Sequence, residues 1–136
     1  MRPRNRQRGA TLLEFAITFM VFFMIAMGIY EFGRVFNMYQ VLTDVVREGA
    51  RYSVAPLQGT SMLPSPADVE ARVQTFLTSD NLSNGTATVQ QTMPVMVNGI
   101  SIVYTQVQVT APYQFIFFPF ATLNLSATSS MRNETN

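Results

Sequence analysis

The residues best placed to do chemistry lie near the start of the sequence. Gly9, beside the basic side chain of Arg8, leaves the backbone accessible, so the Gly9–Ala10 peptide bond is a candidate for hydrolysis. Cleavage there would free an α-ammonium on Ala10, and Glu14 would lie one helical turn further on. Glu14 opens an otherwise uncharged apolar run, where an ionised carboxylate is costly. The residues of this predicted processing site are Gly9, Ala10, Glu14 and Phe15.

The charge on Glu14 needs a partner. An isolated carboxylate and an isolated ammonium are each unfavourable in lipid, but a pair of opposite charges is tolerated. If subunits pack side by side, the Glu14 carboxylate of one can pair with the Ala10 ammonium of its neighbour. Subunits would then slide along one another until the charges meet, so Glu14 is predicted to set the register of an assembly.

The apolar run is long enough to cross a membrane. As a helix, residues 10–30 would span about 31 Å, which matches a hydrocarbon core of about 30 Å. Four of the nine basic residues precede this run, and no basic cluster follows it. The N-terminus is therefore predicted to stay in the cytoplasm while the C-terminal part crosses. The four topology residues are Arg2, Arg4, Arg6 and Arg8.

The remaining composition argues against nucleic acid, metal and cofactor. Beyond the four N-terminal arginines, five basic residues face eight acidic ones, so no basic surface remains for a polyanion. The sequence has neither Cys nor His, which removes thiolate ligands, the commonest metal ligand and the commonest general base. We therefore predict no catalytic residue, no metal site and no cofactor, in a protein that is not an enzyme.

The helical pattern continues beyond the membrane segment. Over residues 31–53, apolar side chains recur three and four apart, which predicts an amphipathic helix. Glu31 and Arg34 are assigned to its polar face, and Pro56 is expected to stop it. The predicted apolar stripe consists of Phe32, Val35, Phe36, Tyr39, Leu42, Val45, Val46 and Ala50.

The small residues of the long helix are interpreted structurally. Gly49 and Ala50 are predicted to let the helix approach a sheet, and Arg51 to bond to nearby backbone carbonyls. Gly28 and Gly33 weaken a helix by up to about 1 kcal/mol each relative to Ala, so they mark either a bend or a close approach.

A second, shorter helix is predicted after a loop. Ser65 is a suitable N-cap, Pro66 suits the first helical position, and Asp68 suits the first turn. The helix is expected to end near Thr78. Its apolar face would consist of Val69, Val73, Phe76 and Leu77.

The rest of the chain alternates like β-strands. Alternation runs over residues 86–93, 100–110 and 123–131, and Asn98-Gly99 predicts a tight hairpin turn. The fold class is therefore α+β: a long N-terminal helix and one short helix pack on a small antiparallel sheet of three or four strands. Residues 113–120 form an aromatic loop that is expected to cover the core. Exposure of its rings would instead indicate an interaction surface.

The N-terminal residues resemble a known family. Residues 8–16, Arg-Gly-Ala-Thr-Leu-Leu-Glu-Phe-Ala, resemble the prepilin-peptidase site of type IV pilin-like proteins. Residues 31–34 and 47–52 resemble TadE-type pseudopilins of the tight-adherence (Flp) pilus system, and residues 107–112 and 131–132 are similar to the C-terminal region of that family. The motif residues that carry the resemblance are Gly33, Arg34, Gly49, Ala50 and Arg51.

The resemblance implies a minor pilin-like subunit of a bacterial inner membrane. It implies cleavage after Gly9 by a prepilin peptidase, and it implies contact with pilin or pseudopilin subunits, with an inner-membrane assembly platform and with the lipid bilayer. The chain would comprise a cleaved cytoplasmic leader (1–9), a transmembrane half-helix (10–30), an amphipathic half-helix (31–53) and a periplasmic pilin-like domain (54–136).

Two alternatives stay open. A secretory signal peptide could be cut after Gly28, two residues beyond the small side chain of Ala26, although the helical pattern runs straight on. A single-pass anchor that is never cleaved would present residues 54–136 as an extracytoplasmic binding module.

Overall fold

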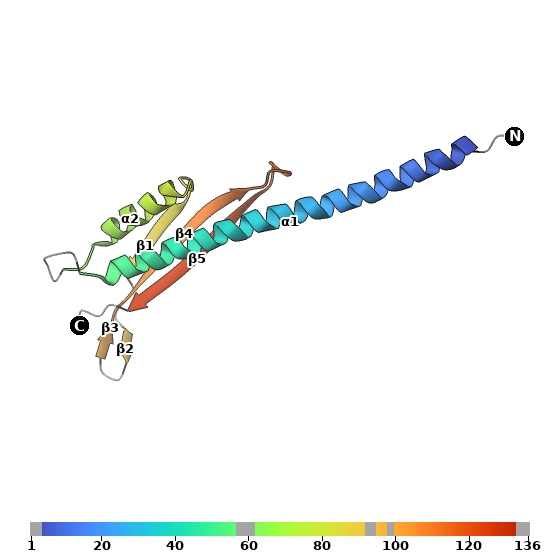
Figure 1. Ribbon diagram of the computed structural model, residues 1–136. Helices are drawn as coiled ribbons and strands as arrows, with labels where there is room; N and C mark the ends of the chain where they lie inside the picture. The colour runs from blue at the N-terminus through green and yellow to red at the C-terminus, as the bar shows by residue number, and fades with distance from the viewer. Residues whose placement is uncertain (1–3, 57–61, 92–94, 98–99, 133–136) are drawn as a thin grey trace. The chain divides into compact units, whose positions relative to one another are not determined.

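The computed structural model describes residues 4–56, 62–91, 95–97 and 100–132, and its contacts divide the chain into two units, Met1–Val35 and Phe36–Asn136. Within the described ranges, helices come first and strands follow (Figure 1), which confirms the α+β class. The elements are α1 (Arg4–Val54), α2 (Pro66–Ser79), β1 (Thr86–Gln91), β2 (Val95–Val97), β3 (Ile100–Ile102), β4 (Tyr104–Gln114) and β5 (Thr122–Arg132).

Helix α1 begins earlier than predicted and ends close to the predicted position. It starts at Arg4 instead of residue 10, because the stretch up to Arg8 contains favourable helix formers and no proline. Its last residue is Val54, two residues before Pro56, whose ring cannot continue a helix. The Gly9–Ala10 bond therefore lies inside α1.

The core of the second unit lies between both helices and the sheet. Buried α1 residues recur three and four apart, as one face of a helix requires. This confirms the prediction that one sheet face packs on the long and the short helix. The core consists of Leu42, Val45, Val46 and Ala50 from α1, Val69, Val73 and Leu77 from α2, and Val89, Val107, Val109, Ala111 and Ala127 from the sheet.

The predicted apolar stripe of α1 is covered only in its C-terminal part. Leu42 and Val46 are buried, whereas Phe32, Phe36 and Tyr39 are 71%, 53% and 46% exposed. The stripe prediction was therefore wrong for these three aromatic residues. Periodicity shows which residues share a face, but the place where a covering element begins depends on tertiary contacts.

The sheet is antiparallel, with strand order β1–β4–β5, and β2 and β3 form a separate hairpin. Val95 pairs with Ile102 and Val97 with Ile100, which confirms the predicted hairpin. Its turn, Asn98-Gly99, lies outside the described residues.

The strand predicted for residues 100–110 is in fact divided at Val103. The part before Val103 is β3, which pairs with β2. The part after Val103 is β4, which pairs with both β1 and β5. β4 also runs on to Gln114, so Tyr113 belongs to a strand and is buried at 4% exposure. Long-range pairing therefore overrides the simple alternation of this stretch.

The predicted start of α2 is confirmed by its cap. The Asp68 backbone N–H donates to the Ser65 hydroxyl oxygen at 3.3 Å, and the Ser65 backbone N–H donates to the Asp68 carboxylate at 3.1 Å. The Ser65 hydroxyl also donates to that carboxylate at 2.7 Å. These hydrogen bonds form a capping box, with Pro66 at the first helical position.

The capping box predicts an acid-sensitive contribution to stability. The Ser65 hydroxyl and then the Ser65 backbone N–H hold the pKa of Asp68 below its ordinary value. A depressed pKa means that the stabilisation is present above the unfolded-state pKa and is lost as the pH falls through the folded-state pKa. Asp68→Asn should therefore lower the urea midpoint of the full chain in micelles at about pH 7 and lower it less at about pH 2.5.

The exposed ion pair of Asp44 with Arg47, at 3.8 Å, supplies the control. Asp44→Asn should change the midpoint little at either pH, because exposed pairs contribute little to stability. Equal effects of Asp68→Asn at both pH values would contradict an ionised cap.

Candidate functional site

The candidate site is the N-terminal part of α1, which is apolar and uncovered. Within the described residues, the part of α1 from Gly9 to Val54 contains a stretch that is long and apolar enough to cross a membrane. None of that stretch is buried in the described structure. Leu13, Phe22 and Met24 are all more than 60% exposed. A helix that is apolar on all sides needs lipid or other helices around it. This helix is therefore a candidate membrane anchor.

The processing residues lie at the entrance of this segment. Gly9 and Ala10 are exposed, and an added Cβ at Gly9 would meet no atom of the described residues within 4 Å. The Gly9–Ala10 bond is nevertheless helical, so a protease needs local unwinding before it can bind an extended backbone. Gly9 reduces the cost of unwinding by about 1 kcal/mol relative to alanine.

Glu14 is exposed on α1, one turn beyond Ala10, so the spacing on which the register prediction depends is present. Next to it, Phe15 begins a ridge of stacked rings. The ring centroids of Phe15 and Phe19 are 6.0 Å apart, and those of Phe19 and Phe23 are 6.3 Å apart. Residues four apart share one face of a helix, so this ridge lies along a single side of the anchor.

The topology residues are only partly visible. Arg2 lies outside the described residues, and Arg4, Arg6 and Arg8 are described by their helical backbone alone. Their number and their place before the apolar segment remain the basis of the orientation prediction.

Glu31 differs from its predicted place on the polar face. It is only 7% exposed, and its carboxylate is 3.3 Å from the Arg34 guanidinium one turn later. An ion pair offsets part of the desolvation of a buried carboxylate. The motif residue Arg34 thus has a local role that the sequence did not reveal. A Glu three residues before an Arg was the available signal.

The small residues of the second motif act as predicted. An added Cβ at Gly49 would lie 2.5 Å from Val73 Cγ2 and 3.3 Å from Val107 Cγ1, and Ala50 is fully buried. Gly49 is therefore where α1 approaches both α2 and β4. By contrast, an added Cβ at Gly28 or Gly33 would meet no described atom within 4 Å, so neither marks a close approach within this part of the chain.

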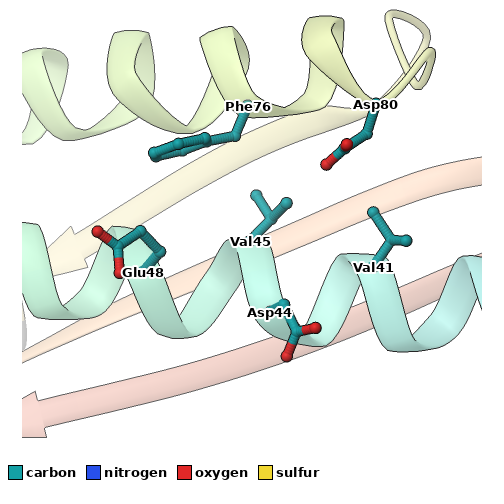
Figure 2. Close-up of a pocket in the computed structure, with 6 residues that line it drawn as sticks. All are labelled: Val41, Asp44, Val45, Glu48, Phe76 and Asp80. Atoms are coloured by element: carbon teal, nitrogen blue, oxygen red, sulfur yellow. The ribbon is translucent and has the colours of Figure 1, made fainter.

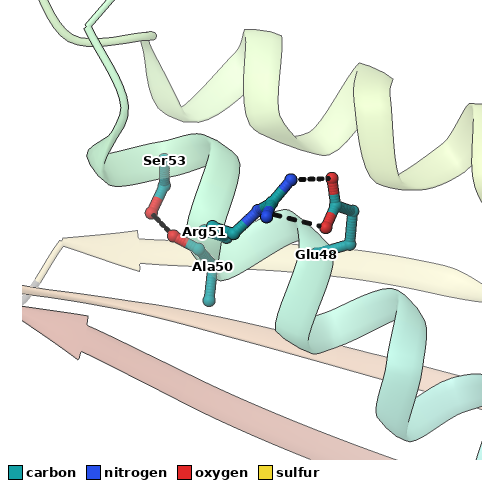
Figure 3. A network of polar contacts seen from close by, with 4 residues as sticks. All are labelled: Glu48, Ala50, Arg51 and Ser53. Atoms are coloured by element: carbon teal, nitrogen blue, oxygen red, sulfur yellow. Dashed lines mark hydrogen bonds and ion pairs between the residues drawn. The ribbon is translucent and has the colours of Figure 1, made fainter.

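Among the described residues, Arg51 pairs with a carboxylate and not with the carbonyls predicted for it. Its guanidinium pairs with the Glu48 carboxylate, with Nε 3.4 Å from Oε2 and Nη2 3.4 Å from Oε1 (Figure 3). The Ala50 carbonyl instead accepts a 2.7 Å hydrogen bond from the Ser53 hydroxyl. The Glu48 carboxylate lies one helical turn before Arg51 and carries a full charge, so it is a stronger partner for the guanidinium than a neutral carbonyl.

One hollow of about 360 Å³ lies between α1 and α2 in the second unit, and it has an acidic rim. Figure 2 shows Val41 and Val45 pointing from α1 toward α2, with Phe76 pointing back from α2. Among the described residues, no group of carboxylates is arranged to hold a metal ion. The lining residues are Val41, Asp44, Val45, Glu48, Phe76 and Asp80.

The aromatic loop does not cover the core as expected. Phe120, Phe118 and Ile116 are 86%, 55% and 52% exposed. The buried residues of the sheet end at Tyr113, before the turn between β4 and β5. The prediction of a core cover was wrong, and this exposed apolar surface is typical of an interaction site.

Comparison with known proteins finds a family match over most of α1. The family model described as TadE-like protein matches residues 9–51, which begin at the processing residue Gly9 and end at Arg51 of the second motif. No curated protein and no solved structure matches the chain. A TadE-like segment associates the chain with components of the tight-adherence pilus in general. Over residues 9–51, from its membrane-length helix to its Gly49-Ala50-Arg51 motif, this chain is similar to the TadE-like family model.

Proposed function

We propose that this chain is a minor pilin-like subunit that acts in assembly of a tight-adherence type IV pilus. One observation carries the proposal: Gly9, Ala10 and Glu14 lie at the start of the apolar stretch of α1, which no described part of the chain covers. A plain anchor gains nothing from a carboxylate at this depth. The TadE-like match over the same residues supports the pilus association.

The proposed pathway starts with a precursor whose arginine-rich N-terminus stays in the cytoplasm. A prepilin peptidase of the inner membrane unwinds the first turns of α1 and cuts after Gly9. Residues 10–30 stay in the bilayer, and the domain beyond residue 53 lies in the periplasm until the subunit joins a filament or its assembly platform. The subunit acts by helix packing and has no catalysis of its own.

Cleavage creates the partner that Glu14 requires. The freed Ala10 ammonium of one subunit pairs with the Glu14 carboxylate of the next, and this ion pair sets their axial register. The ridge that begins at Phe15 supplies the apolar contact beside the pair.

The continuity of α1 across the Gly9–Ala10 bond favours one rival function. An intact helix there is what an uncleaved single-pass anchor would have, with the C-terminal domain acting as an extracytoplasmic binding module.

N-terminal sequencing of the protein extracted from native membranes separates the two. An N-terminus at Ala10 supports the pilin-like subunit, and one at Met1 or Arg2 supports the uncleaved anchor. An N-terminus at Ile29 would indicate a secreted protein and exclude both.

Substitution of Gly9 tests the processing site. Gly9→Leu should leave the precursor uncut, because a bulky side chain blocks access to the bond and strengthens the helix that must unwind. The measurement is the gel shift between precursor and mature forms. Gly28→Leu, in the same helix and also without neighbours within 4 Å, is the matched control and should be processed normally.

A further inference from the structure

The turn between β4 and β5 displays an apolar surface that the pilus proposal does not use. We define the aromatic tip as Phe115, Ile116, Phe117, Phe118 and Phe120. Phe120 is the most exposed of these at 86%, Phe117 is 41% exposed, and Phe115 is half-buried. Several large apolar side chains therefore gather at one end of a sheet without entering its core.

The tip has a defined shape. The Gln114 side-chain amide donates to the Pro119 carbonyl at 3.0 Å, and the Ala121 N–H donates to the Phe118 carbonyl at 2.8 Å. The rings of Phe118 and Phe120 meet edge to face with centroids 5.9 Å apart. Because these contacts are made within the turn, the rings are presented outward by its own structure.

Within the second unit, the tip lies at the end where α1 enters. Gly49 of α1 lies beside Val107 near the start of β4. Val41, two turns earlier in α1, shares the hollow with Asp80, at the end of α2. The turn after α2 brings Gly85 next to Ala111, further along β4. α1 and β4 are therefore antiparallel, as Figure 1 also shows.

Few residues separate the predicted transmembrane half from the second unit. The predicted transmembrane half ends at residue 30, and the second unit begins at Phe36. The helical residues between them cover only about 9 Å. Phe36 and Tyr39, at the same end of the unit as the tip, are also about half exposed. This short connection limits how far the α1 entry of the second unit can lie from the predicted transmembrane half.

The charge pattern favours lipid as the occupant. Residues 81–131, which include the whole sheet except Arg132, contain no charged side chain. The tip therefore lacks the charged groups that form salt bridges at the rim of a typical protein–protein interface. It also lacks the basic residues that attract anionic lipids. Aromatic rings on an uncharged surface are suited to the boundary between headgroups and acyl chains.

We infer that the aromatic tip inserts into the outer headgroup region of the bilayer that α1 spans, and so holds the periplasmic domain against the membrane before assembly. The inference rests on the proposed membrane anchoring of α1. The proposed partner of the tip is lipid, so contact of the tip with a second copy of the chain would contradict the inference. Insertion is apolar and should be the same in zwitterionic and in anionic membranes.

The absence of cysteine from the sequence allows a direct depth measurement with single nitroxide labels on the full chain. Thr122→Cys lies beside the tip, since Thr122 pairs with Gln114. Gln91→Cys lies at the other end of the sheet, where Gln91 pairs with Thr105. Val21→Cys reports on the anchor. Each protein is placed in phosphatidylcholine nanodiscs, with and without phosphatidylglycerol, and probed with oxygen and a water-soluble nickel chelate.

The label at Thr122 should collide with the nickel chelate at least about fivefold less often than the label at Gln91, in both lipids. Equal accessibility at both sites, with Val21 shielded, would overturn the tip inference and leave the anchor standing. An accessible label at Val21 would overturn both. If the label at Thr122 is shielded only when several chains share a nanodisc, the tip binds a second copy of the chain. That result would overturn the inference.

A loss-of-contact variant completes the test. Phe117→Ser, Phe118→Ser and Phe120→Ser together should return the Thr122 label to the accessibility of the Gln91 label. The matched control replaces Met62 and Met96, which are 72% and 71% exposed, with serine. The control should leave the Thr122 label shielded, and equal far-UV circular dichroism of both variants would show that the fold is retained.

Discussion

Glu14→Val is expected to leave cleavage after Gly9 intact and to reduce association between subunits by about two to three orders of magnitude. Removal of one partner of a buried ion pair leaves the other charge uncompensated, at a cost of about 3–5 kcal/mol. Here the uncompensated group is the Ala10 ammonium of the neighbouring subunit. The measurement is pilus yield together with cross-linking between copies in native membranes.

Thr18→Val is the matched control for Glu14→Val. Thr18 lies one turn further along the exposed helix and carries no charge, so its replacement should leave association unchanged. A sharper test combines Glu14→Val with Gly9→Leu. If the uncut leader supplies no ammonium, Glu14→Val should cause no further loss of cross-linking in that background. Wild-type association of the single Glu14→Val variant would refute the register role.

Gly49→Val is expected to cost about 3 kcal/mol or more in the free energy of unfolding, a large share of the stability of a small domain. The new Cβ alone would lie 2.5 Å from Val73 Cγ2, and neither Val73 nor Val107 is exposed. β-branched side chains have little freedom to move away. The measurement is urea unfolding of the full chain in micelles, followed by circular dichroism.

Gly33→Val provides the same substitution in an open part of the same helix. No atom of the residues that the structure describes lies within 4 Å of an added Cβ there, so the change should stay within about 0.5 kcal/mol. Val73→Ala should relieve part of the clash that any new Cβ at position 49 makes. The double variant with Gly49→Ala and Val73→Ala should therefore lose less stability than the sum of the losses of its two single variants. Equal stability of Gly49→Val and Gly33→Val would contradict the close approach of α1 to α2 and β4.

The sequence predicted the features that depend on local rules. The length of residues 10–30 matches a bilayer, Ser65 and Asp68 form the capping box expected of their spacing, and β2 and β3 pair as an antiparallel hairpin. Each of these signals lies within a few residues of its effect. The motif at Gly9 and Glu14 belongs to the same class, and the TadE-like match begins there.

The tertiary structure decided what each face of an element meets. The apolar stripe of α1 is covered from Leu42 onward but not at Phe36, and Glu31 is buried although it was predicted on the polar face. The strand predicted for residues 100–110 is divided at Val103 between two sheets. The aromatic residues after Tyr113 have the composition of a core segment, yet they lie past the end of strand β4 and remain outside the core. Periodicity, caps and charge costs are properties of neighbouring residues, whereas burial depends on which distant segment arrives to cover a surface. For that reason the amino-acid order determined the candidate anchor, the α2 cap and the β2–β3 hairpin, and only the folded chain determined which apolar side chains remained outside.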